Sequence, residues 1–407
     1  MKTILITITL SLLFNLSGYS QISWEKYPGN PVMVPGDPGS FNSGGYAFVT
    51  VIMNNDTLDM WYTVSDQQEQ RIGLARSVNG YEFEFCDSVP LFEPSVGGGF
   101  DTYGVFNPQI LKINDTSWYM WYSGLNNTNF NSQVGLAVSS DGLNWERYST
   151  DPVLPWGPAG SWDNLLVYAG TVLFDEGIYK MWYTGMNTSY TYRIGYATSP
   201  DGIVWTRYQG NPILTFPAAN PKVMKTLTGY QMWYNESVGG KMYIFYALSD
   251  DGIIWQGMDA PVLSPDPGTF DDEGVTAPSV VFNETTGLYQ MWYTAWSAVG
   301  NYYSVGYATD SSLVSIDSPE TINTSLSIYP IPAKNRTVIT FNLNKTSHTT
   351  LSVISLSGIE MLCPLDEIRT PGTYKVELDC SEWPAGIYLC RLIAGNTIVT
   401  RKFIIVK

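Results

Sequence analysis

The sequence predicts an all-β protein in which a five-bladed β-propeller, closed by its N-terminal strand, precedes a small C-terminal β-sandwich. The first observation is a Met-Trp-Tyr triplet that recurs at a period of about 50 to 60 residues, the spacing of propeller blades or solenoid turns. The second is that the last repeat lacks its final strand, whose equivalent stands at the other end of the chain. The third is a change of charge near Ser325. The triplets begin at Met60, Met120, Met181, Met232 and Met291.

Each repeat can be divided into four strands, A to D. Strand B carries the Met-Trp-Tyr triplet, and strand C follows it, as at residues 193–198. Asp-Gly pairs mark the turn from strand C to strand D, because both residues tolerate the positive φ of a tight hairpin. The repeated aspartates of these turns are therefore interpreted as turn formers and not as functional acids. They are Asp141, Asp201 and Asp251.

The missing strand of the fifth repeat is expected at the N-terminus. Residues 24–27, Trp-Glu-Lys-Tyr, match strand D of the second repeat, Trp-Glu-Arg-Tyr at residues 145–148, whereas the fifth repeat stops near Ser312. We expect the N-terminal segment to form the outer strand of the last blade. Such closure leaves no open edge between the first and last repeats, and a solenoid would not require it.

Charge and the character of the chain's ends divide the 407 residues into parts. Residues 1–20 have a positive start, an apolar run and small residues before Gln21, which is typical of a signal peptide. No other stretch is long and apolar enough to span a membrane. Up to Ser325 there are 12 basic and 31 acidic residues, and beyond it 9 and 6. We predict a propeller at 21–312, a linker at 313–325 and a β-sandwich at 326–407.

The net charge of −16 argues against a nucleic-acid partner.

Several kinds of site are excluded by residue counts. The single histidine, His348, lies in the C-terminal part, so the repeats can hold neither a histidine-based zinc site nor a Ser-His-Asp triad. Export would permit one disulfide among Cys363, Cys380 and Cys390, with its pairing left open. No contiguous calcium-binding loop is present. We expect no metal or cofactor, although a central Ca²⁺ would suit the acidic loops.

Strand parity groups the loops into two faces. The D–A and B–C loops share one face of the ring, here called the near face, and they hold aromatic residues beside amides and carboxylates. That combination suits a sugar, whose C–H faces contact rings and whose hydroxyls contact polar groups. The alternative is that many of these aromatics pack between blades. Asp101 and Asp163 occupy equivalent positions of two repeats, so they are expected to shape or assist the site.

Residues that break the repeat are better functional candidates. Glu236 follows Met-Trp-Tyr-Asn where other copies continue with small or apolar residues, and Asp272 and Glu273 add two acids beyond a repeated aspartate. Lys222 is the only charge at its strand-A position. We predict Glu236 and one of Asp272 or Glu273 as catalytic acid and base. The predicted substrate-binding residues are Asp101, Asn107, Gln109, Trp162, Asp163, Asn220, Lys222 and Trp296.

Residues 22–312 resemble the five-bladed propeller glycoside hydrolases of the arabinanase, xylosidase and levanase-like superfamily. The resemblance rests on Met-Trp-Tyr-Thr-Gly, Ile-Gly-Tyr-Ala-Thr-Ser-Pro-Asp-Gly and Asn-Pro-Ile-Leu. It implies hydrolysis of glycosidic bonds by a carboxylate pair. Familiar members carry an acid directly before proline on an inner strand, where this chain has Asn107, Asn220 and Ala277. Either the acids have moved, or the propeller binds glycans without cleaving them.

The last part of the chain resembles the C-terminal sorting domain of the type IX secretion system. The resemblance rests on Tyr-Pro-Ile-Pro at residues 329–332, Pro-Gly-Thr-Tyr at 371–374 and Pro-Ala-Gly-Ile-Tyr at 384–388. It implies contact with that machinery, transport across an outer membrane, removal of the domain, and release or attachment at the cell surface. The sequence thus predicts a secreted carbohydrate-active propeller that hydrolyses a polysaccharide or oligosaccharide. The alternatives are a non-catalytic glycan-binding or adhesion module and a protein-interaction propeller.

Overall fold

The computed structural model divides the chain into two compact units, one spanning residues 22–311 and the other including residues 312–407. It describes residues 24–406 except 55, 87–89, 127–130, 227–228, 284–285, 299–301, 311–325, 344–345, 356–359, 382 and 395–396. The predicted signal peptide, residues 1–20, and the predicted linker, residues 313–325, lie outside the described residues. No helix of the described chain has the length and apolar character that a membrane crossing requires.

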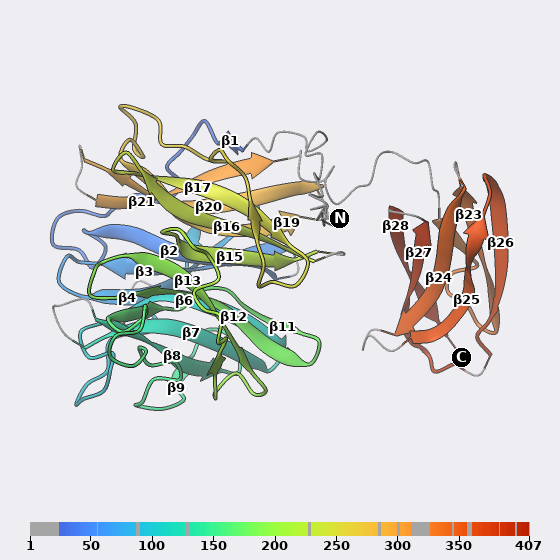
Figure 1. The fold of residues 1–407 in the computed structure, drawn as a ribbon, viewed down its shortest axis with the longest axis horizontal. Helices are drawn as coiled ribbons and strands as arrows, with labels where there is room; N and C mark the ends of the chain where they lie inside the picture. The colour runs from blue at the N-terminus through green and yellow to red at the C-terminus, as the bar shows by residue number, and fades with distance from the viewer. Residues whose placement is uncertain are drawn as a thin grey trace, which may run out of the picture. The chain divides into compact units, whose positions relative to one another are not determined.

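The first unit is a five-bladed β-propeller whose blades run from an inner strand A to a short outer strand D (Figure 1). The first blade contains β2 (Gly45–Asn54), β3 (Thr57–Ser65), β4 (Gln70–Ser77) and β5 (Glu84–Phe85). The second contains β6 (Gly104–Asn114), β7 (Ser117–Leu125), β8 (Ser132–Ser139) and β9 (Glu146–Arg147). The third contains β10 (Leu166–Tyr168), β11 (Val172–Asp175), β12 (Ile178–Met186), β13 (Tyr192–Ser199) and β14 (Thr206–Arg207).

The fourth blade contains β15 (Ala219–Lys225), β16 (Tyr230–Val238), β17 (Lys241–Ser249) and β18 (Gln256–Gly257). The fifth contains β19 (Gly274–Asn283), β20 (Leu288–Ser297) and β21 (Tyr302–Asp310), and β1 (Glu25–Lys26) pairs with its strand C. In that antiparallel pair Glu25 lies opposite Thr309 and Lys26 opposite Ala308. A short segment after β1 continues the contact, with the Val32 N–H donating to the Val305 carbonyl at 2.8 Å.

The Met-Trp-Tyr triplets form the core between blades. Their five tryptophans are at most 1% exposed. Trp182 shows the arrangement, because its indole N–H donates to the carbonyl of Gly252 in the next blade at 2.7 Å. Trp121 and Trp292 make the same bond to Gly202 and Gly80. In three copies the triplet therefore joins neighbouring blades by a hydrogen bond, and in all five its buried tryptophan belongs to the core.

The Asp-Gly turns behave as the sequence predicts. The Asp201 carboxylate accepts hydrogen bonds from the backbone N–H groups of Ile203 and Val204, both at 2.9 Å. Gly202 has a φ of 76°, which a glycine adopts without strain. These bonds hold the pKa of Asp201 below its usual range. Asp141 and Asp251 repeat the arrangement, so all three aspartates serve their turns.

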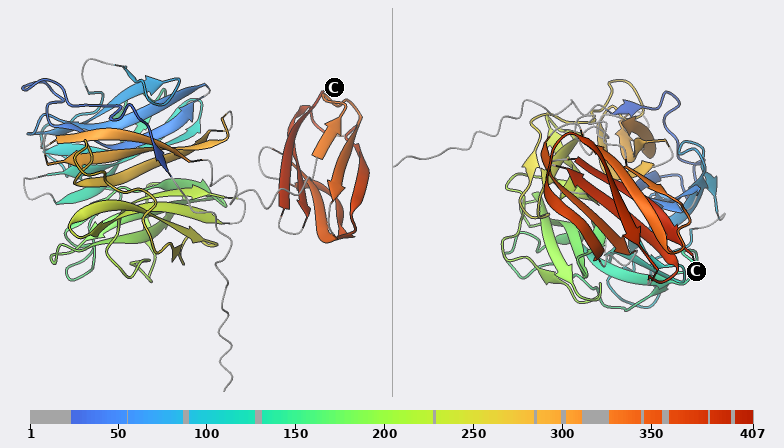
Figure 2. Two further views of the ribbon diagram at one scale, coloured as in Figure 1. Left: turned by 90° about the horizontal axis from the view of Figure 1, so that it is seen from above. Right: turned by 90° about the vertical axis from the view of Figure 1, so that its right-hand side faces the viewer.

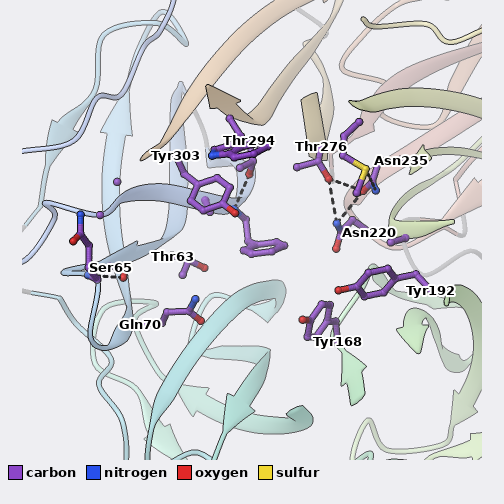
Figure 3. Close-up of a pocket in the computed structure, with 18 residues that line it drawn as sticks. Thr63, Ser65, Gln70, Tyr168, Tyr192, Asn220, Asn235, Thr276, Thr294 and Tyr303 are labelled. Carbon is purple, nitrogen blue, oxygen red and sulfur yellow. Dashed lines mark hydrogen bonds between the residues drawn. The ribbon is translucent and has the colours of Figure 1, made fainter. Parts of the chain in front are cut away.

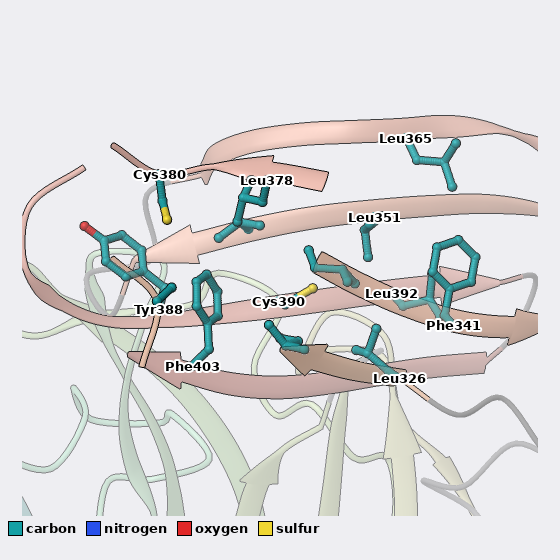
Figure 4. Packing of buried hydrophobic residues seen from close by; sticks show 14 of the residues in the cluster. Leu326, Phe341, Leu351, Leu365, Leu378, Cys380, Tyr388, Cys390, Leu392 and Phe403 are labelled. Carbon is teal, nitrogen blue, oxygen red and sulfur yellow. The ribbon is translucent and has the colours of Figure 1, made fainter. Parts of the chain in front are cut away.

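The second unit contains two β-sheets around one hydrophobic core, and Figure 2 shows it from two further sides. One sheet has the order β22 (Leu326–Tyr329), β23 (Arg336–Leu343) and β26 (Gly372–Asp379). The other has the order β25 (Glu360–Arg369), β24 (Ser347–Ser355), β27 (Gly386–Ala394) and β28 (Thr397–Ile405). Residues of both sheets, among them Phe341 and Leu392, meet in the core (Figure 4).

The four cysteines all lie in the described part of the chain, and none is joined to another by a disulfide. Cys380 and Cys390 are fully buried in the core of the second unit (Figure 4), whereas Cys363 is exposed. The disulfide that export would permit is therefore absent from this structure. Burial raises the pKa of the Cys390 thiol to about 12, so this thiol is protonated at neutral pH.

Candidate functional site

Four of the five inner strands share a β-bulge with one residue at positive φ beside the centre of the ring. The register of β6 shifts between Phe106 and Gln109, and Asn107 there has a φ of 52°. Asn220, Phe48 and Ala277 have φ values of 53°, 46° and 46° at the equivalent bulges. A positive φ is costly for a residue with a Cβ, although asparagine tolerates it better than most. Bulges often re-aim side chains beside functional sites.

A ring of hydrogen bonds holds these bulges in place. The backbone N–H of Asn107 donates at 2.9 Å to the hydroxyl of Thr63, the residue directly after the preceding blade's Met-Trp-Tyr. The same bond joins Ala169 to Ser123, Asn220 to Thr184, and Phe48 to Thr294. The fourth blade has Asn235 instead of a hydroxyl residue at this position. The hydroxyl after the triplet is therefore replaced in one blade only, and the replacing residue, Asn235, lies beside a large cavity.

The central cavity has a volume of about 670 Å³ and is lined by inner strands and by the ends of strands B and C (Figure 3). It lies on the near face, where the D–A and B–C loops meet. Its lining contains aromatic, amide and hydroxyl side chains, and no described lining residue is a carboxylate. The lining residues are Gly44, Gly45, Ala47, Phe48, Thr63, Ser65, Gln67, Gln70, Tyr168, Tyr192, Ala219, Asn220, Asn235, Met242, Thr276, Thr294, Trp296 and Tyr303.

Three side chains on the cavity wall form an oriented network, drawn with dashed lines in Figure 3. The Asn220 amide N–H donates to Asn235 Oδ1 at 2.9 Å and to Thr276 Oγ1 at 3.4 Å. The Thr276 hydroxyl donates to the same Asn235 oxygen at 2.7 Å. The remaining atom, Asn220 Oδ1, is buried and accepts no hydrogen bond from the described residues. The network thus fixes the Asn220 amide and leaves its buried Oδ1 as an acceptor without a donor among the described residues.

Tyrosines line the same cavity beside this network. Burial raises the pKa of Tyr168, and the neighbouring Tyr192 and Tyr303 raise it further. Burial also raises the pKa of Tyr303. Both phenols are therefore neutral at physiological pH and can donate hydrogen bonds, while their rings offer flat apolar surfaces.

The predicted catalytic residue Glu236 lies next to this cavity in sequence but does not line it. Side chains alternate along β16, so Asn235 faces the cavity and Glu236 faces the other side. The Glu236 carboxyl contacts the hydroxyl of Tyr234, two residues earlier on the same side. Partial burial raises the pKa of Glu236.

Asp272 and Glu273 lie in the loop before β19. Lys241 Nζ donates to the Asp272 backbone carbonyl at 2.5 Å and contacts the Glu273 carboxylate at 3.4 Å. One Asp272 carboxyl oxygen is buried without a hydrogen-bond partner among the described residues. Both acids therefore lie at the boundary between the fourth and fifth blades, and neither lines the central cavity.

Asp101, Asp163 and Trp162 are built into the blades. Asp163 is 1% exposed, and its carboxylate accepts from Arg207 at 2.9 Å and from the Tyr183 hydroxyl at 3.1 Å. Asp101 makes the same pair of contacts with Arg147 and Tyr122. Trp162 packs against Gly185 and Gly195, where a side chain would clash with its ring. These three residues join strands of one blade and do not line the cavity.

The remaining predicted binding residues divide between two places. Asn220 and Trp296 line the central cavity. Asn107, Gln109 and Lys222, again with Asn220, line a second, smaller cavity on the propeller axis, here called the axial cavity. Asn107 is held there by a 2.7 Å bond from its amide N–H to the Ala169 carbonyl.

The predicted substrate-binding set omits several lining residues, including Thr276, Tyr168 and Tyr303. It also omits Asn235, which belongs to the predicted near-face loops and replaces the hydroxyl residue that follows the triplet in every other copy. Within the described residues, no group of three or more His, Cys, Asp or Glu side chains is arranged to hold a metal ion.

A five-bladed ring with a central cavity of aromatic, amide and hydroxyl groups defines the class of a carbohydrate-active propeller. A sequence profile of the glycoside hydrolase 130 family, described as β-1,4-mannooligosaccharide phosphorylase, matches residues 126–312. An uncharacterized protein of Mycobacterium tuberculosis is 30% identical over 215 residues, which cover 47% of this chain and 67% of that protein. The chain belongs to the glycoside hydrolase 130 family.

Solved structures agree with this fold. A β-1,2-mannobiose phosphorylase from Listeria innocua superposes with a TM-score of 0.54 at 15% identity, over 72% of this chain and 98% of that chain. A glycoside hydrolase 130 structure, described with hydrolases that target β-1,2 mannosidic linkages in Candida mannan, has a TM-score of 0.58 at 18% identity, over 72% and 95%. The family differs in name from the arabinanase-like group of the sequence resemblance, and it shares the five-bladed fold and carbohydrate activity.

The second unit is a secretion system C-terminal sorting domain, whose profile matches residues 327–406. This domain confirms the predicted route through the type IX secretion system. The protein is therefore secreted or displayed at the cell surface.

Proposed function

We propose that the propeller binds a mannoside-containing oligosaccharide in the central cavity. The observation that carries this proposal is the lining of the cavity, which combines aromatic rings, amides and hydroxyls without a carboxylate. A volume of about 670 Å³ is within the usual range for small-molecule sites and leaves room for a few sugar units. The family match supports mannose as the sugar.

Asn220 Oδ1, the acceptor without a donor, is expected to make the cavity prefer certain sugars. A buried oxygen without a donor costs about 1–3 kcal/mol, and a sugar hydroxyl directed at Asn220 Oδ1 would remove that cost. The network with Asn235 and Thr276 prevents the amide from turning its N–H toward the ligand. We therefore expect the cavity to select a sugar with a hydroxyl at this place.

This expectation is tested with Asn220→Gly, which tolerates the positive φ and removes the amide. Binding of β-1,2- and β-1,4-mannooligosaccharides is measured by titration calorimetry, and the variant is expected to bind at least about tenfold more weakly. Asn144→Gly, on the opposite face, is the control and should bind like the wild type. Equal affinities of the wild type and Asn220→Gly would contradict the role of Asn220. Absence of binding to any mannoside would contradict the sugar class.

We further propose that the glycan extends beyond the central cavity to the neighbouring loops and is cleaved there, with Glu236 and one of Asp272 or Glu273 as the acids. The raised pKa of Glu236 supports a general acid, which must stay protonated near working pH. Cleavage is measured as released reducing ends with and without inorganic phosphate, because only phosphorolysis requires phosphate. Loss of turnover in Glu236→Gln, with mannoside binding unchanged, is the expected result.

The second candidate function is glycan binding without cleavage. It is favoured by the amides of Asn107 and Asn220 directly before proline, where an amide cannot act as base, and by the absence of carboxylates from the described cavity lining. Mannoside binding without turnover under either condition would favour it.

The proposal includes the organisation of the whole chain. The pairing of β1 with β21 supports a ring closed by the N-terminal strand, and the two C-terminal sheets around one core support a β-sandwich. The sorting domain would bring the propeller to the secretion machinery, and the propeller would then meet its glycan outside the cell.

A further inference from the structure

The axial cavity lies on the propeller axis, since inner-strand residues of all five blades line it. Its volume of about 20 Å³ accommodates about one water-sized species. A phosphate group or a sugar ring does not fit in that space. Any occupant is therefore a single water molecule or a monatomic ion.

Lys222 is the charged group in this cavity. Its ammonium makes no hydrogen bond or ion pair with any described residue. The other described lysines of the propeller all have a carboxylate partner within 3.4 Å. These are Lys26, Lys112, Lys180, Lys225 and Lys241. Lys222 thus differs from them in a chain whose net charge is −16.

Hydrogen-bond donors surround the same space. Ser279 Oγ accepts from the Val51 N–H at 2.9 Å, which leaves its hydroxyl hydrogen available. The Gln109 side-chain amide uses one N–H for Asn107 Oδ1 at 3.1 Å, and its second N–H is unused among the described residues. The Thr50 hydroxyl donates away from the cavity, to the Pro108 carbonyl. Asn220 lines this cavity as well as the central one, and none of the described lining residues is a carboxylate.

The charge of Lys222 persists despite burial. Burial lowers the pKa of Lys222 to about 8, so the ammonium remains mostly protonated at pH 7. Lys222 is half-buried. A charge partly withdrawn from water without a partner is unfavourable, and the described protein groups supply no partner. A small anion would supply it.

We infer that the axial cavity binds a single monatomic anion of the size of chloride, held by the Lys222 ammonium with the Ser279 hydroxyl and the Gln109 amide as further donors. The anion neutralises the one unpaired lysine of the described propeller and joins donors from three blades. This site is separate from the glycan-binding role of the central cavity.

The test measures thermal unfolding of the full chain while sodium chloride replaces sodium methanesulfonate at constant ionic strength. The propeller's Tm is expected to rise by about 2–4 °C and to saturate, because an anion that binds only the folded state stabilises it. Bromide should act like chloride, and a crystal soaked in bromide should show an anomalous peak beside Lys222.

Two variants at nearby positions make the test specific. Lys222→Met has a similar length and no charge, so its Tm should not respond to chloride. Lys225→Met is the control on the same strand, and it should respond like the wild type. The same chloride response in Lys222→Met, or a wild type without a chloride response, would overturn the inference. If Lys222→Met does not fold, a bromide-soaked wild-type crystal without the axial peak would overturn it.

Discussion

The change at Glu236 has a structural explanation in the residues around it. In three blades the triplet tyrosine donates to a buried aspartate, as Tyr183 does to Asp163. The fourth blade has a shorter loop before β15 and no such aspartate, and its triplet tyrosine, Tyr234, contacts Glu236 instead. Glu236 therefore makes the contact with the triplet tyrosine that an aspartate makes in three other blades. A catalytic role for Glu236 must be compatible with this contact.

This contact predicts a pH-dependent effect of Glu236→Gln on stability. Burial raises the pKa of Glu236 in the folded state, so the protonated form contributes stability that is complete below the ordinary pKa of glutamate. That contribution is lost as pH rises through the folded pKa. Glutamine does not titrate, so the variant should gain free energy of unfolding relative to the wild type between pH 4 and pH 7. The gain should stay below about 1 kcal/mol, because the carboxyl is partly exposed.

Urea unfolding at pH 4, 5.5 and 7 measures this difference. The exposed Glu146→Gln is the control, and its difference from the wild type should not vary with pH. A Glu236→Gln difference that is constant or that falls as pH rises would show that the folded protein does not penalise the ionised carboxyl.

At the scale of the strands, the hydroxyl that follows four of the five triplets joins neighbouring blades. Thr63 on β3 accepts the N–H of Asn107 on β6, and Thr184 on β12 accepts that of Asn220 on β15. Each acceptor satisfies a backbone group that the bulge removes from the strand ladder. The bulge and the hydroxyl therefore depend on each other across a blade boundary.

Thr63→Val is predicted to destabilise the propeller by about 1–3 kcal/mol. Valine keeps the shape of threonine but leaves the buried N–H of Asn107 without an acceptor. Thr198→Val is the control, because this half-buried threonine on β13 makes no side-chain hydrogen bond within the described part of the chain. Chemical unfolding measures both variants. Equal losses from the two substitutions would show that the hydroxyl of Thr63 has no special role.

The strands were predictable because the triplets and the Asp-Gly turns carry local signals, whereas the site depends on several blades at once. Phe48 and Ala277 adopt a positive φ that neither residue favours by itself, so the ring imposes it. Trp162 was predicted to bind substrate but fills space beside two glycines, which its sequence position does not reveal. Asn220 and Trp296 were predicted to bind substrate and line the central cavity, whereas the bond of Asn235 with Thr276 joins two blades and could not be read from one repeat.

At the scale of the whole molecule, the acidic propeller keeps its described carboxylates away from the central and axial cavities. Asp101, Asp163 and Asp271 each bind a cation on an outer strand, and Glu273 binds Lys241. The described residues that line the central and axial cavities include no carboxylate. A strongly negative chain can therefore present a neutral site to a sugar and a positive one to a small anion.

The link between the chain's first strand and its last blade gives the final prediction. Lys26 on β1 contacts the Asp271 carboxylate at 2.6 Å, and that carboxylate is completely buried. Lys26→Met should destabilise the propeller by about 3 kcal/mol, because a buried charge loses its partner. Lys112→Met, whose partner Asp115 is exposed, should change stability by less than about 0.5 kcal/mol.

Urea unfolding and limited proteolysis of residues 24–33 distinguish two outcomes. Release of this segment together with unfolding of the blades supports closure by β1. Its release from a propeller of unchanged stability would show that the ring does not need it.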